Sequence, residues 1–338
     1  MGSEKNRNVR LIRRPLGLPA PADFQLVESQ IPSPNPGQVL VRNLFMSVDP
    51  YMRGRMADRK SYFPPFQLGE VLQGRAVGKV TAGEAGDLRP GDYVSSMNGW
   101  REWFVSNGEG LKKIDPASAP LEAYLSVLGA TGMTAYIGLT RIDKVKDGDR
   151  VFVSDAAGAV GMTACQIARN RGAHVIGSAG SDEKCAFLRD ELKIGAINYR
   201  KTSDLAAALA DAFPAGIDLY FDNVGGGHLA AALDNMRVGG RIVVCGMIGQ
   251  YNTVSPPPAP VNLLNIGVRS LTMRGFIFTD HLDLTEPFER EMRAWIAEGK
   301  MIWRQTVITG IENAPAAFIG LFKGENFGKM LVKLGEDE

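Results

Sequence analysis

The chain has 338 residues, which at roughly 100 to 200 residues per domain predicts about two domains. Lys and Arg number 38 against 37 Asp and Glu, and this balance argues against a surface built to neutralise nucleic-acid phosphates or an anionic membrane. Hydrophobic residues make up 45% of the chain, which excludes disordered, collagenous and disulfide-stapled classes. Glycine is in excess, with 39 residues, so we expect segments of unusual backbone.

Thiols and imidazoles are scarce and unevenly placed. All lie beyond residue 164: Cys165, Cys185, Cys245, His174, His228 and His281. We therefore expect no zinc site and no histidine base in the first half of the chain. An odd number of widely spaced cysteines suits a reducing compartment, and we see neither a secretory signal nor a run of about 18 apolar residues. We expect a cytoplasmic protein without a membrane span.

The first third predicts a β-rich domain, because short alternating runs such as 38–43 and 76–81 are separated by clusters of Pro and Gly. The rhythm changes near residue 120 and returns to short strands near the end. We expect a first domain made of residues 1–125 and 299–338, with residues 126–298 forming a second domain.

Strands and helices alternate in the second domain, as in a parallel sheet covered on both faces. This predicts an α/β fold with a doubly wound parallel sheet. The predicted strands are 150–154, 174–178, 217–221 and 241–245; the predicted helices end at residue 170 or span 182–191, 227–236 and 284–298. A further edge strand is expected at 267–275.

The strongest motif is the turn Ala156-Ala-Gly158-Ala-Val-Gly161, between a predicted strand and a predicted helix. It has G-x-G-x-x-G spacing with alanine in the first place. The helix dipole and free N–H groups there favour a pyrophosphate. A tight turn in any doubly wound fold would need similar glycines, but the flanking elements favour dinucleotide binding.

The next strand indicates which dinucleotide binds. NAD sites usually place an acid about 20 residues after the glycines, and here Gly177 and Ser178 occupy that place with Lys184 nearby. Small residues and an ammonium group would accept a 2′-phosphate, which favours NADP(H). Alternatively, Lys184 is a solvated lysine in the first turn of a helix.

Five further motifs follow the glycine turn in order: Gly180-Ser-Asp-Glu-Lys184, Ile197-Asn-Tyr199, Phe221-Asp-Asn223-Val-Gly-Gly226, Cys245-Gly-Met-Ile-Gly-Gln-Tyr251 and Gly324-Glu-Asn326-Phe-Gly-Lys329. Together they resemble the medium-chain dehydrogenase/reductase superfamily. Within it, the chain resembles the zinc-free double-bond reductases, which include prostaglandin reductases (leukotriene B4 12-hydroxydehydrogenases), plant alkenal reductases and bacterial curcumin reductases. The resemblance implies a GroES-like catalytic domain, a Rossmann domain, NADPH and a homodimer.

The resemblance also implies a set of cofactor-binding residues: Gly158, Ala159, Val160 and Gly161 at the pyrophosphate; Ser181, Lys184 and Tyr199 at the 2′-phosphate end; and Asn223, Cys245, Gly246, Met247, Ile248, Gly249, Gln250, Tyr251, Phe276, Phe278 and Asn326 along the remainder. Three of them fit a purely local structural function equally well. Tyr199 fits a strand end, Asn223 fits a turn, and Asn326 fits a left-handed turn residue before Gly328.

Asp155 departs from the family pattern, because relatives usually have a small or neutral residue just before Ala156. A carboxylate facing the pyrophosphate would weaken cofactor binding. We therefore expect the Asp155 side chain to point away from it.

Zinc-dependent alcohol dehydrogenases hold their catalytic metal with Cys and His ligands in the first domain, and this chain has none there. A conjugated carbonyl is then the easier substrate, because hydride adds to its β-carbon and the enolate oxygen needs only hydrogen-bond donors. We expect Tyr251 to be that donor, since a phenol stays protonated at neutral pH. Tyr51 stands where zinc enzymes place their first ligand and is a second candidate. Alternatively, Tyr251 only supports the cofactor and Tyr51 is only a pocket wall.

The expected substrate is a hydrophobic α,β-unsaturated aldehyde or ketone. Its expected pocket is lined by Tyr51, Tyr62, Phe66, Met97, Asn98, Trp100, Phe276 and Phe278, although aromatic clusters are more often core. The rival functions are an NADPH quinone reductase and a non-catalytic NADPH-binding or RNA-binding protein, and the near-zero charge counts against RNA. The strand expected at 267–275 would pair across a twofold axis in the homodimer.

Overall fold

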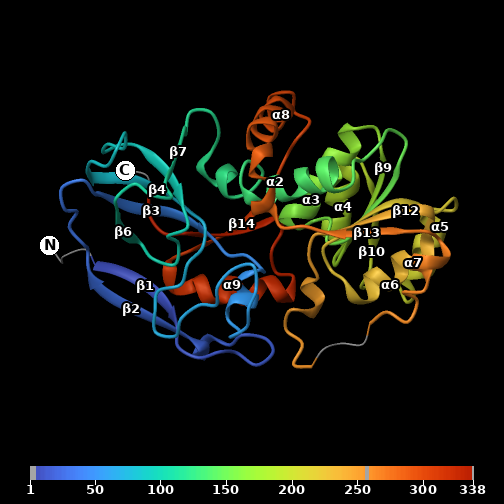
Figure 1. Ribbon diagram of the computed structural model, residues 1–338, viewed down its shortest axis with the longest axis horizontal. Helices are drawn as coiled ribbons and strands as arrows, with labels where there is room; N and C mark the ends of the chain where they lie inside the picture. Colours follow the sequence, from blue (N-terminus) through green and yellow to red (C-terminus); the bar gives the residue numbers. More distant parts are fainter. Residues whose placement is uncertain (1–4, 256–258, 337–338) are drawn as a thin grey trace. The chain divides into compact units, whose positions relative to one another are not determined.

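The computed structural model describes residues 5–255 and 259–336, which form two compact units (Figure 1). Unit 1 comprises residues 1–125 and 305–338, and unit 2 comprises residues 126–304. The chain returns to unit 1 at residue 305 rather than 299, because the intervening residues are bonded to unit 2. The N–H of Ile302 donates to Gln166 Oε1 at 2.8 Å, and Arg304 forms an ion pair with Glu191.

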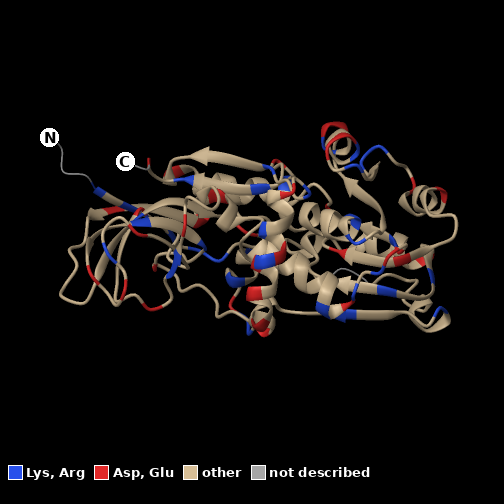
Figure 2. Cartoon of the chain, turned by 90° about the horizontal axis from the view of Figure 1, so that it is seen from above, with Lys and Arg blue, Asp and Glu red and all other residues tan. Residues whose placement is uncertain are grey.

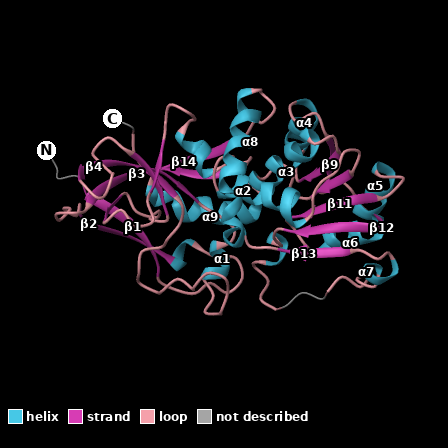
Figure 3. Cartoon of the chain, turned by 45° about the horizontal axis from the view of Figure 1, so that its top comes forward, coloured by secondary structure: helices cyan, strands magenta, loops and turns pink. Residues whose placement is uncertain are grey.

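Unit 2 contains a six-stranded sheet in the order β10-β9-β8-β11-β12-β13, and all of its pairs are parallel. The strands are β8 (Arg150–Val153), β9 (His174–Ala179), β10 (Gly195–Asn198), β11 (Ile217–Asp222), β12 (Met236–Val244) and β13 (Thr272–Gly275). The helices are α2 (Ala130–Ile137), α3 (Ala159–Asn170), α4 (Asp182–Asp190), α5 (Leu205–Ala212), α6 (Gly226–Asn235), α7 (Asn265–Val268) and α8 (Thr285–Ala297). Figure 3 shows helices on both faces of the sheet.

The central strands are buried on both faces because their side chains alternate between two apolar layers. Phe152 of β8 and Tyr220 of β11 stack at 5.0 Å and share a core with Leu209 of α5 and Leu233 of α6. On the other face, Phe221 lies against the backbone beyond α2, where a Cβ on Gly138 would meet its ring at 2.5 Å. The predicted doubly wound sheet is confirmed.

The edge strand predicted at 267–275 is partly wrong. Residues 265–268 form α7, and only Thr272–Gly275 pair with β12. Ser270, which has a left-handed φ of 50°, lies between the helix and the strand, where the chain turns. The short strand β13 is nevertheless the edge of the sheet.

Unit 1 is β-rich and discontinuous in sequence. Its larger sheet has the order β14-β15-β3-β4-β5-β7, with β6 also paired to β3, and β1 and β2 form a separate antiparallel pair. The strands are β1 (Lys5–Leu11), β2 (Phe24–Gln30), β3 (Val39–Ser47), β4 (Ala76–Gly83), β5 (Tyr93–Ser96), β6 (Trp103–Ser106), β7 (Lys112–Ile114), β14 (Gln305–Thr309) and β15 (Lys329–Lys333); the helices are α1 (Met52–Arg55) and α9 (Ala314–Lys323).

Basic and acidic residues are interspersed in the described parts of both units (Figure 2). Lys and Arg therefore lie close to Asp and Glu in both units. No helix within residues 5–255 and 259–336 is long and apolar enough to cross a membrane.

Candidate functional site

The glycine turn lies at the carboxyl end of β8, between that strand and α3. Strand β8 pairs with β9 on one side and β11 on the other, so the strand order reverses at this point. Open α/β sheets bind ligands at such a switch point. Helix α3 begins at Ala159, and its first backbone N–H groups have no partners within the helix. They are therefore available to a pyrophosphate.

Two glycines are required by close backbone approach at this turn. A Cβ on Gly161 would lie 2.1 Å from the carbonyl oxygen of Asp155. A Cβ on Gly177, in the middle of β9, would lie 2.3 Å from the Cβ of Ala156. These contacts bring α3 and β9 against the turn, so the turn and helix have the form that a dinucleotide needs.

The expectation that Asp155 points away from the turn is wrong. Its φ of 50° is left-handed, and this backbone turns the side chain back over the loop. A Cβ on Gly158 would lie 2.2 Å from Asp155 Oδ2. The carboxylate therefore covers the glycine expected to allow close phosphate approach.

The residues expected at the 2′-phosphate end meet at the start of α4. Ser181 caps this helix, because its Oγ accepts the N–H of Lys184 at 3.2 Å. A Cβ on Gly180 would lie 2.9 Å from the Tyr199 hydroxyl oxygen and 3.2 Å from Arg200 Nε. Burial lowers the pKa of Lys184, and the positive charge of Arg200 acts in the same direction.

Arg200 was not predicted from the sequence. Its exposed guanidinium lies beside Gly180 and acts on Lys184, so two cations share this end of the sheet. Its position next to Tyr199 was the available signal. An arginine is suited to a phosphate because its fork of donors matches two oxygens.

The loops that follow β11 and β12 are joined by backbone hydrogen bonds. The carbonyl of Asp222 accepts hydrogen bonds from the N–H groups of Cys245 at 2.9 Å and Gly246 at 3.1 Å. The carbonyl of Asn223 accepts one from the N–H of Ile248 at 3.1 Å. Gly225 has a φ of 70°, and a Cβ there would lie 2.8 Å from Met247 Cγ. These two motifs therefore form one surface at the carboxyl edge.

A buried polar cluster supports these loops and was not predicted either. The Tyr220 hydroxyl donates to Asp222 Oδ1 at 2.6 Å, which also accepts the N–H groups of Val224 at 3.0 Å and Gly225 at 2.8 Å. Burial raises the pKa of Asp222. An Asp at a strand end, followed by Asn and glycines, was the signal for this turn.

Asn223 has a structural function, because its Nδ2 donates to the Ser154 carbonyl at 2.7 Å and ties β11 to β8. This agrees with the turn interpretation. A contact between Asn223 and the cofactor remains a prediction. Phe276 and Phe278 follow the carboxyl end of β13 and are half-buried, so they lie at the same edge of the sheet.

Tyr251 ends the loop after β12, and its hydroxyl folds back over that loop. A Cβ on Gly246 would lie 3.0 Å from the hydroxyl oxygen. Burial raises the pKa of Tyr251, a backbone hydrogen bond from Met247 opposes this shift, and the nearby Asp222 adds to it. The phenol therefore stays protonated at neutral pH and keeps a proton to donate.

Tyr51 belongs to unit 1, in a group of aromatic side chains around Arg55. Its ring lies 5.5 Å from Phe63, and Phe63 lies 5.3 Å from Tyr62. The Arg55 guanidinium lies 4.1 Å from the centre of Phe66. Burial raises the pKa of Tyr51, and the Asp49 carboxylate adds to this shift, so Tyr51 also stays protonated.

Other residues expected in unit 1 have structural functions. Trp100 is fully buried and stacks on Phe24 at 6.1 Å, so it belongs to the core rather than to a pocket wall. Asn326 is not left-handed; it donates Nδ2 to the carbonyl of Gly328 at 2.8 Å within its own turn. Met97 and Asn98 are half-buried. Phe66, which is 5% exposed, belongs to the same core as Trp100, and the half-buried Tyr51 packs against that core.

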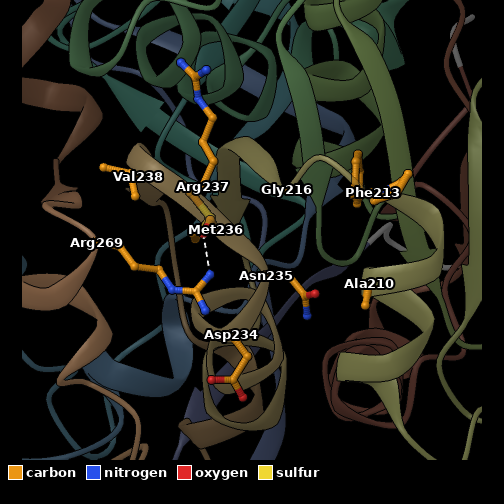
Figure 4. Close-up of a pocket in the computed structure, with 10 residues that line it drawn as sticks. Ala210, Phe213, Gly216, Asp234, Asn235, Met236, Arg237, Val238 and Arg269 are labelled. Carbon is orange, nitrogen blue, oxygen red and sulfur yellow. Dashed lines mark hydrogen bonds between the residues drawn. The ribbon is translucent and has the colours of Figure 1, made fainter.

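A pocket of about 380 Å³ opens where β11 and β12 begin (Figure 4). This is the amino edge of the sheet, opposite the glycine turn. Arg269, one of its lining residues, donates to the Met236 carbonyl at 2.5 Å, and Arg237 is paired with Asp218. The pocket has no part in the candidate cofactor site.

No group of three or more His, Cys, Asp or Glu side chains is arranged to hold a metal ion within the part of the chain that the structure describes.

Comparisons with known proteins identify the class to which this site belongs. Residues 7–114 match a family described as the N-terminal domain of oxidoreductase, and residues 159–298 match the zinc-binding dehydrogenase family. The chain is 39% identical to the NADPH-dependent curcumin reductase of Escherichia coli, over 100% of both chains. It is also 39% identical to the NADP(+)-dependent 2-alkenal reductase of Nicotiana tabacum, over 98% of both.

A solved structure agrees with this relationship. CurA from Vibrio vulnificus, in complex with NADPH, superposes with a TM-score of 0.92 at 40% identity, covering 98% of this chain and 99% of that one. The chain belongs to the medium-chain dehydrogenase/reductase family. Within that family it belongs to the subfamily of prostaglandin, alkenal and curcumin reductases, and both predictions are confirmed.

Proposed function

We propose that this protein is an NADPH-dependent reductase of the C=C bond in α,β-unsaturated aldehydes and ketones. The curcumin and 2-alkenal reductases to which it is similar over the whole chain support this class of substrate. The observation that carries the proposal is the protonated, half-buried Tyr251 hydroxyl at the same sheet edge as the glycine turn.

The residues of unit 2 fit NADPH. The closely packed turn at Gly161 presents free N–H groups for the pyrophosphate, while Lys184 and Arg200 supply positive charge for the 2′-phosphate. When bound, NADPH supplies a hydride, which the β-carbon of the enone receives.

The catalytic task of the chain is to stabilise negative charge on the carbonyl oxygen. Tyr251 does so by donating a hydrogen bond to that oxygen as the enolate forms. Because its pKa is raised, the phenol does not lose its proton in neutral solution. Solvent protonates the α-carbon and completes the saturated carbonyl. Tyr51 is the second candidate donor, and the kinetics of Tyr251→Phe and Tyr51→Phe separate the two.

The test is NADPH consumption with a panel of enals, enones and quinones, with products identified by mass spectrometry. We expect products two hydrogens heavier, with the carbonyl retained. Reduction of quinones without reduction of any enone would favour the rival quinone reductase. A folded protein that binds NADPH and reduces nothing would be a non-catalytic binder.

We also propose a homodimer that pairs β13, the edge strand of the unit 2 sheet, with its copy. Exposed apolar side chains nearby support this: Val261, Leu264 and Val268 are 101%, 75% and 69% exposed. A sedimentation velocity run that shows only monomers at working concentration would reject it. A cytoplasmic location is supported by the three cysteines, which are all unpaired.

A further inference from the structure

Asp155 combines a strained backbone with an unusual position. It is the second residue after β8 and has a φ of 50°, a region that residues other than glycine rarely adopt. Asp and Asn tolerate this conformation better than other side chains do. The chain therefore accepts some backbone strain to hold a carboxylate over the glycine turn.

The carboxylate lies where a pyrophosphate would approach. Its Oδ2 occupies the space of a Cβ on Gly158, the residue that caps α3. It accepts no hydrogen bond from residues 5–255 or 259–336 that would hold it there. The side chain keeps access to solvent, as expected of a group at the mouth of a binding site.

Few charges surround Asp155. The ammonium of Lys184, from α4, is the opposite charge that acts on it, and Arg200 acts on Lys184 in turn. Burial raises the pKa of two thiols, Cys165 in α3 and Cys245 after β12, and keeps both thiols protonated. The Asp155 charge raises both pKa values further. Asp222 acts on Cys245 from the end of β11.

We propose that the Asp155 carboxylate competes with the dinucleotide pyrophosphate for the glycine turn, so that cofactor binding is coupled to uptake of a proton by Asp155. This inference deepens the proposed function, on which it rests, by naming a residue that sets cofactor affinity. It requires only that a dinucleotide binds, not that an enone is reduced.

The sign of the pH dependence follows from linkage. Desolvation by the surrounding protein atoms raises the pKa of Asp155 to about 6, and the positive charge of Lys184 limits this shift. A bound pyrophosphate adds negative charge and raises this pKa further, so the complex holds more protons than the free protein. Dinucleotide affinity therefore falls as the pH rises from about 6 to about 8, until both forms are ionised.

The variant Asp155→Asn tests this without changing the backbone, because asparagine also tolerates left-handed φ. The dissociation constant of NADPH is measured from its fluorescence on binding, at several pH values. We expect the variant to bind about tenfold more tightly than wild type near pH 8. The two should differ by less than about twofold near pH 5.5, where the wild-type carboxyl is largely protonated.

Two controls isolate the turn. Asp182→Asn removes an exposed acid from the first turn of α4, at the same sheet edge, and should leave the pH dependence unchanged. NADH serves as a second probe because it has no 2′-phosphate, a group whose own pKa is about 6. The effect of Asp155→Asn should persist with NADH, since both dinucleotides contain the pyrophosphate.

Calorimetry in two buffers of different ionisation enthalpy counts the protons directly. Wild type should take up a fraction of a proton near pH 7, and Asp155→Asn should take up less. Equal affinities of the two proteins at every pH, or an affinity ratio that does not change with pH, would overturn the inference. If neither protein binds any dinucleotide, the proposed function fails as well.

Discussion

The ammonium of Lys329 donates a hydrogen bond to Asp49 Oδ1 at 2.9 Å, although 280 residues separate the two in the sequence. The same ammonium donates to the Val48 carbonyl at 2.9 Å. The two side chains are only 3% and 11% exposed. Lys329 begins β15 and Asp49 lies just beyond β3, so the ion pair joins the two sequence segments of unit 1 where their strands meet.

Replacing Lys329 with methionine should destabilise the protein by about 3 to 5 kcal/mol, because Asp49 would remain buried without its cation. Urea unfolding followed by fluorescence measures this change. Lys333→Met is the matched control: Lys333 also lies in β15 but pairs with the exposed Glu336, so its loss should cost about 1 kcal/mol or less. Equal losses of unfolding free energy in the two variants would contradict the larger stabilising contribution expected of the buried ion pair.

Lys184→Met should weaken NADPH binding by about tenfold or more and leave NADH binding nearly unchanged, because only NADPH presents a 2′-phosphate to the ammonium. Fluorescence titration with both dinucleotides gives the two affinities. Lys201→Met is the control, since Lys201 is exposed and pairs with Asp182. A similar loss for both dinucleotides would assign Lys184 to the shared part of the cofactor.

Tyr251→Phe should lower kcat for enone reduction by about 100-fold, the scale expected when one donor to an oxyanion is removed. The dissociation constant of NADPH should change by less than about twofold. Steady-state kinetics and a binding titration separate these effects. Tyr136→Phe, which changes a buried tyrosine packed on Phe288, is the control. Parallel losses of kcat and NADPH affinity would make Tyr251 a binding residue, and Tyr51→Phe would then be tested as the donor.

His228 should make the protein less stable in mild acid. Burial lowers its pKa to about 4, and its Nε2 has no hydrogen-bond partner among the described residues. Between about pH 6.5 and pH 4 the unfolded chain therefore binds more protons than the folded protein does. The free energy of unfolding is unaffected by His228 above pH 6.5 and decreases as the pH falls below it, by up to about 1.4 kcal/mol per pH unit.

His228→Phe keeps the ring contact with Tyr199, which has a centroid distance of 4.9 Å in the wild type, and should flatten the acid side of the stability profile. Urea unfolding at several pH values provides the comparison. His174→Gln, at an exposed position that begins β9, should leave the profile as it is. An unchanged slope in His228→Phe would show that other groups cause the acid loss.

The sequence was most informative where structure is local. The strand β8, the glycine turn and α3 were predicted together, because an apolar run, small residues and helical spacing are adjacent in the chain. Strand β12 was predicted to begin at residue 241. It begins at Met236, since parallel pairing with β11 continues past an irregularity in register.

The site was less predictable where side-chain direction decides function. The orientation of Asp155 depends on a left-handed φ. Aspartate tolerates this conformation, but its presence in a sequence does not predict it. An aromatic cluster is more often core than pocket, but residue type alone left Trp100 as a pocket candidate; its full burial and its stacking on Phe24 place it in the core. Arg200 approaches Lys184 through the parallel pairing of β10 and β9, which periodicity does not specify.

The discontinuity of unit 1 bears on how the chain folds during synthesis. Strand β15 lies between β14 and β3 in the sheet order, yet it is made after the whole of unit 2. In the first 125 residues, residues 39–42 of β3 can already pair with β6, but residues 45–47 lack their partner β15. Unit 2, by contrast, has all of its strands once residue 275 is made. Unit 2 can close first, and the last segment then completes the earlier one. Truncation near residue 326 should leave residues 45–47 of β3 as an exposed, aggregation-prone edge.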